Sequence, residues 1–194
     1  MKVHTYDIEG VLLIEPRRFH DARGFFSETY NADDLAVHGV NTRFVQDNVS
    51  LSTARGTLRG LHFRSPPQAQ AKLIRVARGA IFDVAVDIRA ASPTFGKHVG
   101  VELSAENALQ LFVPAGFAHG FVTLRPLTEI AYKVSAPYSS EHDRGILWND
   151  PRLRIAWPVD EHEAVLSAKD AALPLLGEIE TPFKYCPAET EVAA

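Results

Sequence analysis

The chain has 194 residues, of which 46% are hydrophobic, enough for one sizeable buried core. Its formal charge of -4 includes no basic block, so neither nucleic acid nor an anionic membrane surface is expected as a partner. A single cysteine, Cys186, allows no disulfide within the chain, and no apolar run has the length of a signal peptide or a membrane span, which favours the cytoplasm.

Short apolar stretches, broken by Gly, Pro, Asn and Asp, follow one another along the chain and predict strands. In chain order these are 11–15, 25–30, 43–51, 57–63, 72–77, 81–89, 99–104, 109–113, 120–124 and 128–135. Two helices are predicted, 31–38 with Asn31 as N-cap and Gly39 as stop, and 167–173 with Ser167 as N-cap. Many short strands without alternating long helices favour an all-β sandwich, barrel or jelly roll over a parallel α/β fold.

No internal repeat and no Pro/Gly-rich or charged linker divides the sequence, so residues 1–183 are predicted to form one domain. The stretch 184–194 has no periodicity and ends in small and acidic residues, which predicts a mobile tail.

Six polar residues share a strand face with large apolar residues. Because strand side chains alternate between faces, such residues are expected to point inward; they are Lys72, Tyr132, Gln46, Asn48, His62 and His119. A core does not normally admit an ammonium, two imidazoles, a phenol and two amides, because each buried polar group costs free energy unless it is paired. A ligand cavity between the sheets would admit them all.

Each residue also has a purely structural interpretation. A lone inward histidine can be a satisfied core residue, Tyr132 can bond a backbone carbonyl, and Lys72 can extend to an open strand end. Their coincidence on successive strands favours the cavity. Arg59 and His62 lie three apart and would face opposite ways on a regular strand, which makes Arg59 a surface residue; a bulge at Gly60 would instead put both into the cavity.

Longer motifs stand around these residues: TLRGLHF (57–63), QAKL (70–73), FDVAVDIR (82–89), SPTFG (92–96), VPAGFAHGF (113–121), WND (148–150) and SAKD (167–170). In these motifs and their order, the chain closely resembles the dTDP-4-dehydrorhamnose 3,5-epimerases. The resemblance implies a cupin-type jelly roll and a homodimer. It also implies conversion of dTDP-4-dehydro-6-deoxy-D-glucose, a dTDP-4-keto-6-deoxyhexose, to dTDP-4-dehydro-L-rhamnose.

The resemblance further implies a role for individual residues. It makes His62 the proton acceptor, Tyr132 the proton donor on the opposite face of the sugar, and Asp170 the carboxylate partner of His62. Lys72 would lie near the sugar ketone, and Tyr138 would stack on the thymine. The other implied substrate contacts are Arg23, Glu28, Gln46, Asp47, Asn48, Arg59, His119, Asp143 and Lys169.

Some of these positions have other interpretations. Asp143 departs from the family, whose members often carry Glu there. Ser167 and Asp170 also form an N-terminal capping pattern, in which the carboxylate would satisfy the helix start. Glu28 and Asp143 could be surface charges at the rim of a pocket, and Arg23, before Gly24, could be a turn residue.

The residue types suit proton transfer next to a ketone. In a 4-keto sugar the hydrogens on C3 and C5 are both alpha to the carbonyl, and histidine, with an unperturbed pKa of about 6.5, can remove one as a neutral base. A carboxylate such as Asp170 would fix the tautomer, and the Lys72 ammonium would stabilise the charge on the ketone oxygen. A phenol, with an unperturbed pKa of about 10, could return the proton.

The same residues also bear on other possible functions. A metal-dependent cupin usually presents His-x-His followed by Glu and a third His, but here the motif reads His62-Phe-Arg64 and only His119 remains as a second ligand. Neither a metal nor another cofactor is therefore predicted. A non-catalytic nucleotide-sugar-binding jelly roll would not need His62, Tyr132 and an orienting carboxylate together. Epimerases that invert only C3 or only C5, and ketoisomerases of the same substrate, are not distinguished by sequence.

Overall fold

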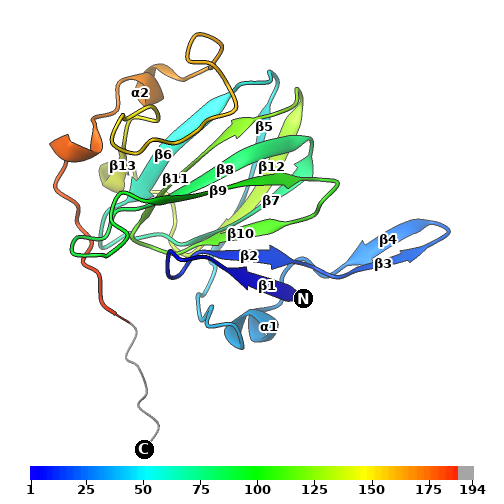
Figure 1. The fold of residues 1–194 in the computed structure, drawn as a ribbon. Coiled ribbons are helices and arrows are strands. Elements are labelled where there is room, and N and C mark those ends of the chain that lie inside the picture. The colour runs from blue at the N-terminus through cyan, green and yellow to red at the C-terminus, as the bar shows by residue number, and fades with distance from the viewer. Residues whose placement is uncertain (188–194) are drawn as a thin grey trace, which may run out of the picture.

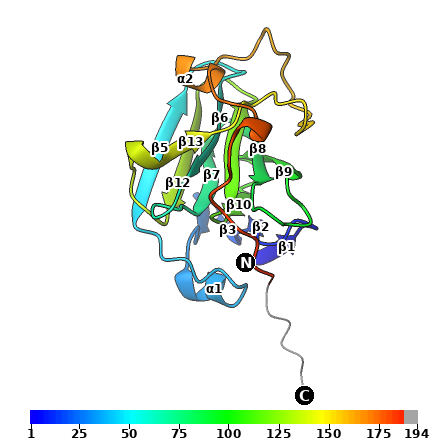
Figure 2. The same ribbon diagram turned by 90° about the vertical axis from the view of Figure 1, so that its left-hand side faces the viewer.

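The computed structural model describes residues 1–187, whose regular structure is mainly antiparallel β (Figure 1). The first sheet has the strand order β1–β2–β10–β7–β12–β5, with bounds Lys2–Thr5, Leu12–Glu15, Gln110–Val113, Lys72–Arg78, Thr128–Val134 and Gln46–Ser52. The second has the order β13–β6–β11–β8–β9, with bounds Asp143–Gly145, Leu58–Arg64, Phe117–Thr123, Ala80–Asp87 and His98–Ser104. The two sheets pack face to face (Figure 2), which confirms the predicted jelly roll.

A third, two-stranded sheet stands apart from these layers. It is the hairpin of β3 (Arg18–Asp21) and β4 (Gly24–Ser27), which projects away from the body of the molecule (Figure 1). Strand β3, like β1 and β13, was not predicted from sequence. All three are only three or four residues long and largely polar, so alternation has too few positions to show.

Both predicted helices exist but are shorter than expected. Helix α1 spans Ala32–Ala36, and its N-cap Asn31 accepts hydrogen bonds from the backbone N–H groups of Asp33 and Asp34. Helix α2 spans Ala168–Ala171. Two short 3-10 turns, Ser140–His142 and Leu176–Glu178, complete the regular structure.

Apolar side chains fill three layers. Between the sheets lies a core that includes Ile74, Ile81, Leu103 and Phe121. Outside the first sheet, Leu35 of α1 belongs to a second cluster with Leu73 and Phe112, and outside the other, Leu153 and Leu176 of the C-terminal segment pack on Val84 and Val86. Strand β8 is consequently buried on both faces, which explains why apolar residues occupy both of its faces and only Asp83 and Asp87 are polar.

The C-terminal segment stays attached to the body beyond residue 183, where the tail was predicted to begin. Lys184 forms a bridge with Ala90, and the Tyr185 hydroxyl donates to Glu9 at 2.7 Å. The rest of the predicted tail, 188–194, lies outside the described residues. Among residues 1–187, no helix is long and apolar enough to cross a membrane.

Candidate active site

A cavity of about 510 Å³ lies between the two sheets. Its volume is in the usual range for small-molecule sites. Eight predicted site residues line it: Arg59, His62, Lys72, His119, Tyr132, Asp143, Lys169 and Asp170. They come from both sheets and from α2, so the fold gathers groups that are up to 111 residues apart in sequence (170 − 59 = 111).

An irregularity in β6 brings two of these groups to one face. On β11, His119 pairs with His62 while Phe121 pairs with Arg59, so three residues of β6 span two of β11. This is the bulge at Gly60 that was considered as an alternative to a regular strand, and it places both Arg59 and His62 along the cavity. Arg59 lines the cavity while its side chain stays exposed to solvent.

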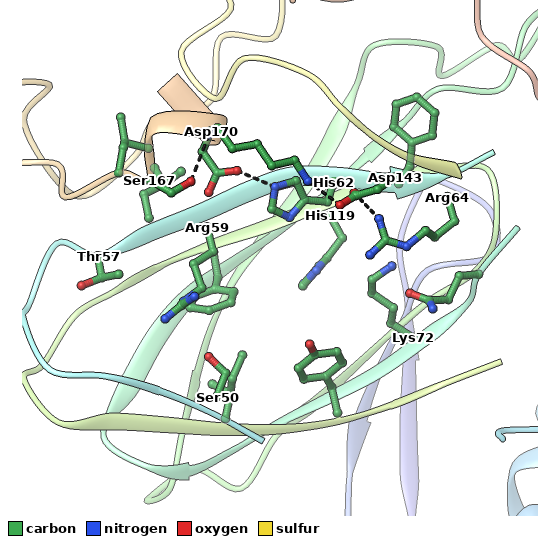
Figure 3. Close-up of a pocket in the computed structure, with 18 of the residues that line it drawn as sticks. Ser50, Thr57, Arg59, His62, Arg64, Lys72, His119, Asp143, Ser167 and Asp170 are labelled. Carbon is green, nitrogen blue, oxygen red and sulfur yellow. Dashed lines mark hydrogen bonds and ion pairs between the residues drawn. The ribbon is translucent and has the colours of Figure 1, made fainter. Parts of the chain in front are cut away.

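His62 is held by a buried carboxylate. Its Nε2 lies 2.6 Å from Oδ1 of Asp170, whose side chain is only 5% exposed (Figure 3). Burial alone would raise the pKa of Asp170, but the hydrogen bond and charge of His62 outweigh it and lower that pKa. The carboxylate is thus ionised near neutral pH, His62 donates through Nε2, and Nδ1 is left to accept a proton.

The helix that carries Asp170 is capped by a different group. Ser167 Oγ accepts a hydrogen bond from the backbone N–H of Asp170 at 3.1 Å. Because the serine provides the cap, the carboxylate remains available for His62. Ser167 is therefore the cap, as the sequence predicted, and the Asp170 carboxylate does not satisfy the helix start.

His119 has a carboxylate of its own. Its Nε2 lies 2.8 Å from Oδ1 of Asp83 on β8, a residue with no exposed surface. The other oxygen, Oδ2, is buried and has no hydrogen-bond partner among the described residues. A half-satisfied buried carboxylate costs free energy, so its retention behind a cavity histidine is a mark of function.

Lys72 is buried at the start of β7, shares the inward face of that strand with the core residue Ile74, as parity predicted, and lines the cavity. Burial, and then the nearby Arg64 guanidinium, lower the pKa of Lys72 to about 8, while Asp143 opposes the shift. The ammonium therefore carries its charge at neutral pH but is poorly solvated. A poorly solvated cation favours an anionic ligand.

Tyr132 lies on the opposite sheet from His62, so the two approach the cavity from opposite sides. Burial raises the pKa of Tyr132, and the charges of Arg64 and Arg59 offset part of the increase. Its hydroxyl makes no hydrogen bond to another residue in the stretch 1–187. The phenol therefore stays protonated at neutral pH and is not anchored to a backbone carbonyl.

Asp143 joins three elements. Its carboxylate on β13 accepts from Arg64 on β6 and from Lys169 on α2 (Figure 3). Burial would raise the pKa of Asp143, but the bonds to Lys169 and Arg64 lower it. Asp143 thus faces two cations inside the cavity and is not a solvated surface charge.

The other predicted contacts lie outside this cavity. Gln46 and Asn48 face inward on β5, beside Val134 and Tyr132, and bond each other at 2.7 Å. Asp47 faces outward and pairs with Lys133 at 2.9 Å.

Tyr138 is 63% exposed, and Arg23 and Glu28 lie on and just after the β3–β4 hairpin, where Arg23 pairs with Asp21. The roles proposed for these six residues in substrate binding stay predictions.

Several polar residues of the site were missed from sequence, among them Arg64, Ser50 and Gln70, which line the cavity, and Asp83, which supports it. Parity contained a signal for two of them, since Arg64 is two positions from His62 and Ser50 is two from Asn48. Asp83 is a charged residue between the apolar residues of β8.

One group within residues 1–187 has the spacing to hold a metal ion: Asp160, His162 and Glu163, all exposed. None of the three lines the cavity. Inside the cavity the two histidines each use Nε2 for a carboxylate, which is an arrangement for proton transfer.

Known proteins are similar to this chain in sequence and fold. The family model for dTDP-4-dehydrorhamnose 3,5-epimerase matches residues 5–178. The dTDP-4-dehydrorhamnose 3,5-epimerase of Sinorhizobium fredii is 53% identical over 185 residues, 95% of this chain and 94% of the relative.

Two solved structures superpose closely. The dTDP-4-dehydrorhamnose 3,5-epimerase from Bacillus anthracis, with TDP and PPi bound, gives a TM-score of 0.87 at 55% identity and covers 90% of this chain and 98% of that chain. The Legionella pneumophila dTDP-6-deoxy-D-glucose-3,5-epimerase, in complex with dTDP-4-keto-L-rhamnose, gives 0.91 at 45% identity and covers 96% and 99%. Because sequence and fold agree over nearly its whole length, the chain belongs to the dTDP-4-dehydrorhamnose 3,5-epimerase family.

Proposed function

We propose that the protein converts dTDP-4-dehydro-6-deoxy-D-glucose to dTDP-4-dehydro-L-rhamnose by removing and returning protons at C3 and C5. The observation that carries the proposal is the His62–Asp170 pair on one wall of the cavity with Tyr132 on the other. Family membership and the nucleotide-sugar complex of the Legionella relative support it.

In this mechanism His62 Nδ1 takes the proton from the carbon next to the ketone. Asp170 stabilises the imidazolium that forms, and the Lys72 ammonium stabilises the enolate oxygen. The Tyr132 hydroxyl then protonates the carbon from the opposite face, which inverts the centre. No step requires a metal or another cofactor.

The nucleotide half of the substrate needs cations and an aromatic plane. Arg59 and Lys169 line the cavity and can face the diphosphate, and exposed Tyr138 offers a stacking surface for the base. His119, positioned by Asp83, can bond a sugar hydroxyl or the ketone.

We also infer a homodimer. Strand β5 has inverted polarity: Gln46, Asn48 and Ser50 face inward while Val49 and Leu51 face outward, and Val49 is 70% exposed. Phe25 and Phe26 of the projecting hairpin are exposed as well. Apolar surface of this kind is typical of an interface, and a dimer would carry Arg23 and Glu28 on the hairpin towards the partner.

The single-domain assignment of residues 1–183 and the cytoplasmic compartment remain proposals. The first is supported by the four apolar clusters, whose members come from residues between Met1 and Phe183. The second rests on the lone cysteine.

The deciding experiment is product analysis by NMR, with dTDP-4-keto-6-deoxyglucose as substrate and deuterated water as solvent. Inversion and deuterium at both C3 and C5 are expected, and His62→Ala should lose both. Inversion at one carbon only would show that the protein is a single-site epimerase. Movement of the ketone to another carbon would show a ketoisomerase, and tight binding without any exchange would show a non-catalytic binding module. Activity lost to a chelator and restored by one added metal would overturn the metal-free mechanism.

A further inference from the structure

Arg64 lines the cavity, but neither the family resemblance nor the mechanism proposed above gives it a role. It follows His62 by two positions on β6, faces the same side, and lines the cavity with a side chain that is 14% exposed. One end of its guanidinium, Nη1, donates to Asp143. Its Nε is buried and has no hydrogen-bond partner among the described residues.

The guanidinium is fixed from two sides. Asp143 holds it by an ion pair, and its central carbon lies 4.9 Å from the centroid of the Tyr138 ring. In Figure 3 it points into the cavity directly beside the Lys72 ammonium. A donor that is positioned before the ligand arrives needs no reorganisation when charge develops on that ligand.

The local charge is unbalanced. Two cations, Arg64 and Lys169, pair with the carboxylate of Asp143, and the Lys72 ammonium lines the same cavity with no ion pair among the described residues, so positive charge exceeds negative charge here. Two charged groups act on Lys72, Arg64 from β6 and Asp143 from β13. Arg64 disfavours the protonated form of Lys72. Two neighbouring cations in a half-buried cavity are stabilised when an anion binds between them.

We propose that Arg64 is a further catalytic residue, whose guanidinium joins Lys72 in binding the ketone oxygen of the substrate as that oxygen becomes negative. This inference rests on the proposed function. The C–H bond breaks, its proton goes to His62, its electron pair forms the C=C bond, and the carbonyl π pair moves to the oxygen between Arg64 and Lys72. Arg64 donates hydrogen bonds throughout and transfers no proton.

The test compares Arg64→Gln and Arg64→Lys with Arg78→Gln, a control at the exposed end of β7. Arg64→Gln should lower kcat and the rate of deuterium uptake together by about 10² to 10³, the usual loss for one such donor. Arg64→Lys should recover part of the rate, while the Kd for dTDP and the Arg78→Gln rate stay unchanged. Asp143 keeps Lys169 as a partner, so the fold should survive, which thermal melting checks.

The pH profile measures the effect of the Arg64 charge on Lys72, and the kinetic constants distinguish a catalytic Arg64 from a structural one. Without the Arg64 charge the Lys72 pKa rises from about 8, so the alkaline limb of kcat/KM moves to higher pH. If Arg64→Gln leaves kcat unchanged but raises KM and the Kd for dTDP, Arg64 binds the diphosphate. If its kinetics are unchanged, Arg64 forms only a structural ion pair. Either result overturns this inference but leaves the proposed function intact. A wild-type protein that neither inverts nor exchanges would overturn the proposed function and this inference with it.

Discussion

Two histidines in adjacent positions across β6 and β11 are each held through Nε2 by a buried carboxylate, and the carboxylates come from unrelated elements. Asp170 lies in a short helix after the last strand, whereas Asp83 lies in the middle of β8. Both ring orientations are thereby fixed before substrate arrives. A preorganised ring needs no reorientation in the transition state.

Replacement of Asp83 tests whether this support matters for the reaction. Asp83→Asn should raise KM by about 5- to 150-fold, because a buried donor left without its charged acceptor costs about 1–3 kcal/mol and His119 would lose its fixed orientation. Steady-state kinetics measures the effect. A variant with normal kinetics and a lowered melting temperature would show that the Asp83–His119 pair serves only the core.

Tyr132→Phe separates the two proton transfers. The variant keeps the base and the enolate stabiliser, so hydrogen exchange at C3 or C5 should continue while inversion falls by about 10² to 10⁴. NMR in deuterated water follows both rates on one sample. If inversion proceeds at the wild-type rate, the phenol is a packed core residue and the donor is another group.

At the scale of single elements, the bulge in β6 decides which residues meet the ligand. It is possible because Gly60 has φ +122 and lies against β11 so closely that an added Cβ would be 2.5 Å from Gly120 Cα. A regular β6 would turn either Arg59 or His62 away from the cavity. The bulge, a local departure from regular strand geometry, therefore brings Arg59 and His62 to the same cavity.

Gly60→Ala should lower the free energy of unfolding by about 2–5 kcal/mol, the sum of overpacking and a left-handed backbone. Gly39→Ala is the matched control, since Gly39 also has positive φ, +84, but has nothing within 4 Å of an added Cβ. It should lose only about 1–2 kcal/mol. Chemical denaturation measures both, and equal losses would show that the contact with β11 is unimportant.

At the scale of the whole molecule, the apolar surface of β5 and the hairpin argues for a second copy. Phe26→Glu should weaken the dimer by about 2 kcal/mol or more, which is roughly 30-fold in Kd, because Phe26 is 69% exposed in the single chain. Val37→Glu is the control: Val37 is 80% exposed but is the C-cap of α1 and belongs neither to β5 nor to the hairpin. Light scattering measures the mass, and a monomeric wild type at micromolar concentration would contradict the dimer.

Local patterns in the sequence determined the β class, the predicted strands and both helix caps. Strand periodicity and capping act between residues a few positions apart, so they can be read without the fold. Parity likewise predicted that Lys72, His62, His119 and Tyr132 point inward, whereas the bulge at Gly60 was only an alternative that the sequence left open.

Only the tertiary structure decided which inward groups meet. The pairing of Asp83 with His119 joins strands 36 positions apart, and the bonds of Asp143 to Arg64 and Lys169 join three elements. Parity gives the face of a strand but not its neighbour in the sheet or its partner across the cavity, because those depend on sheet order and packing. That Asp47 faces away from the cavity while Gln46 and Asn48 face inward follows from strand alternation, but its pairing with Lys133 depends on the neighbouring strand β12.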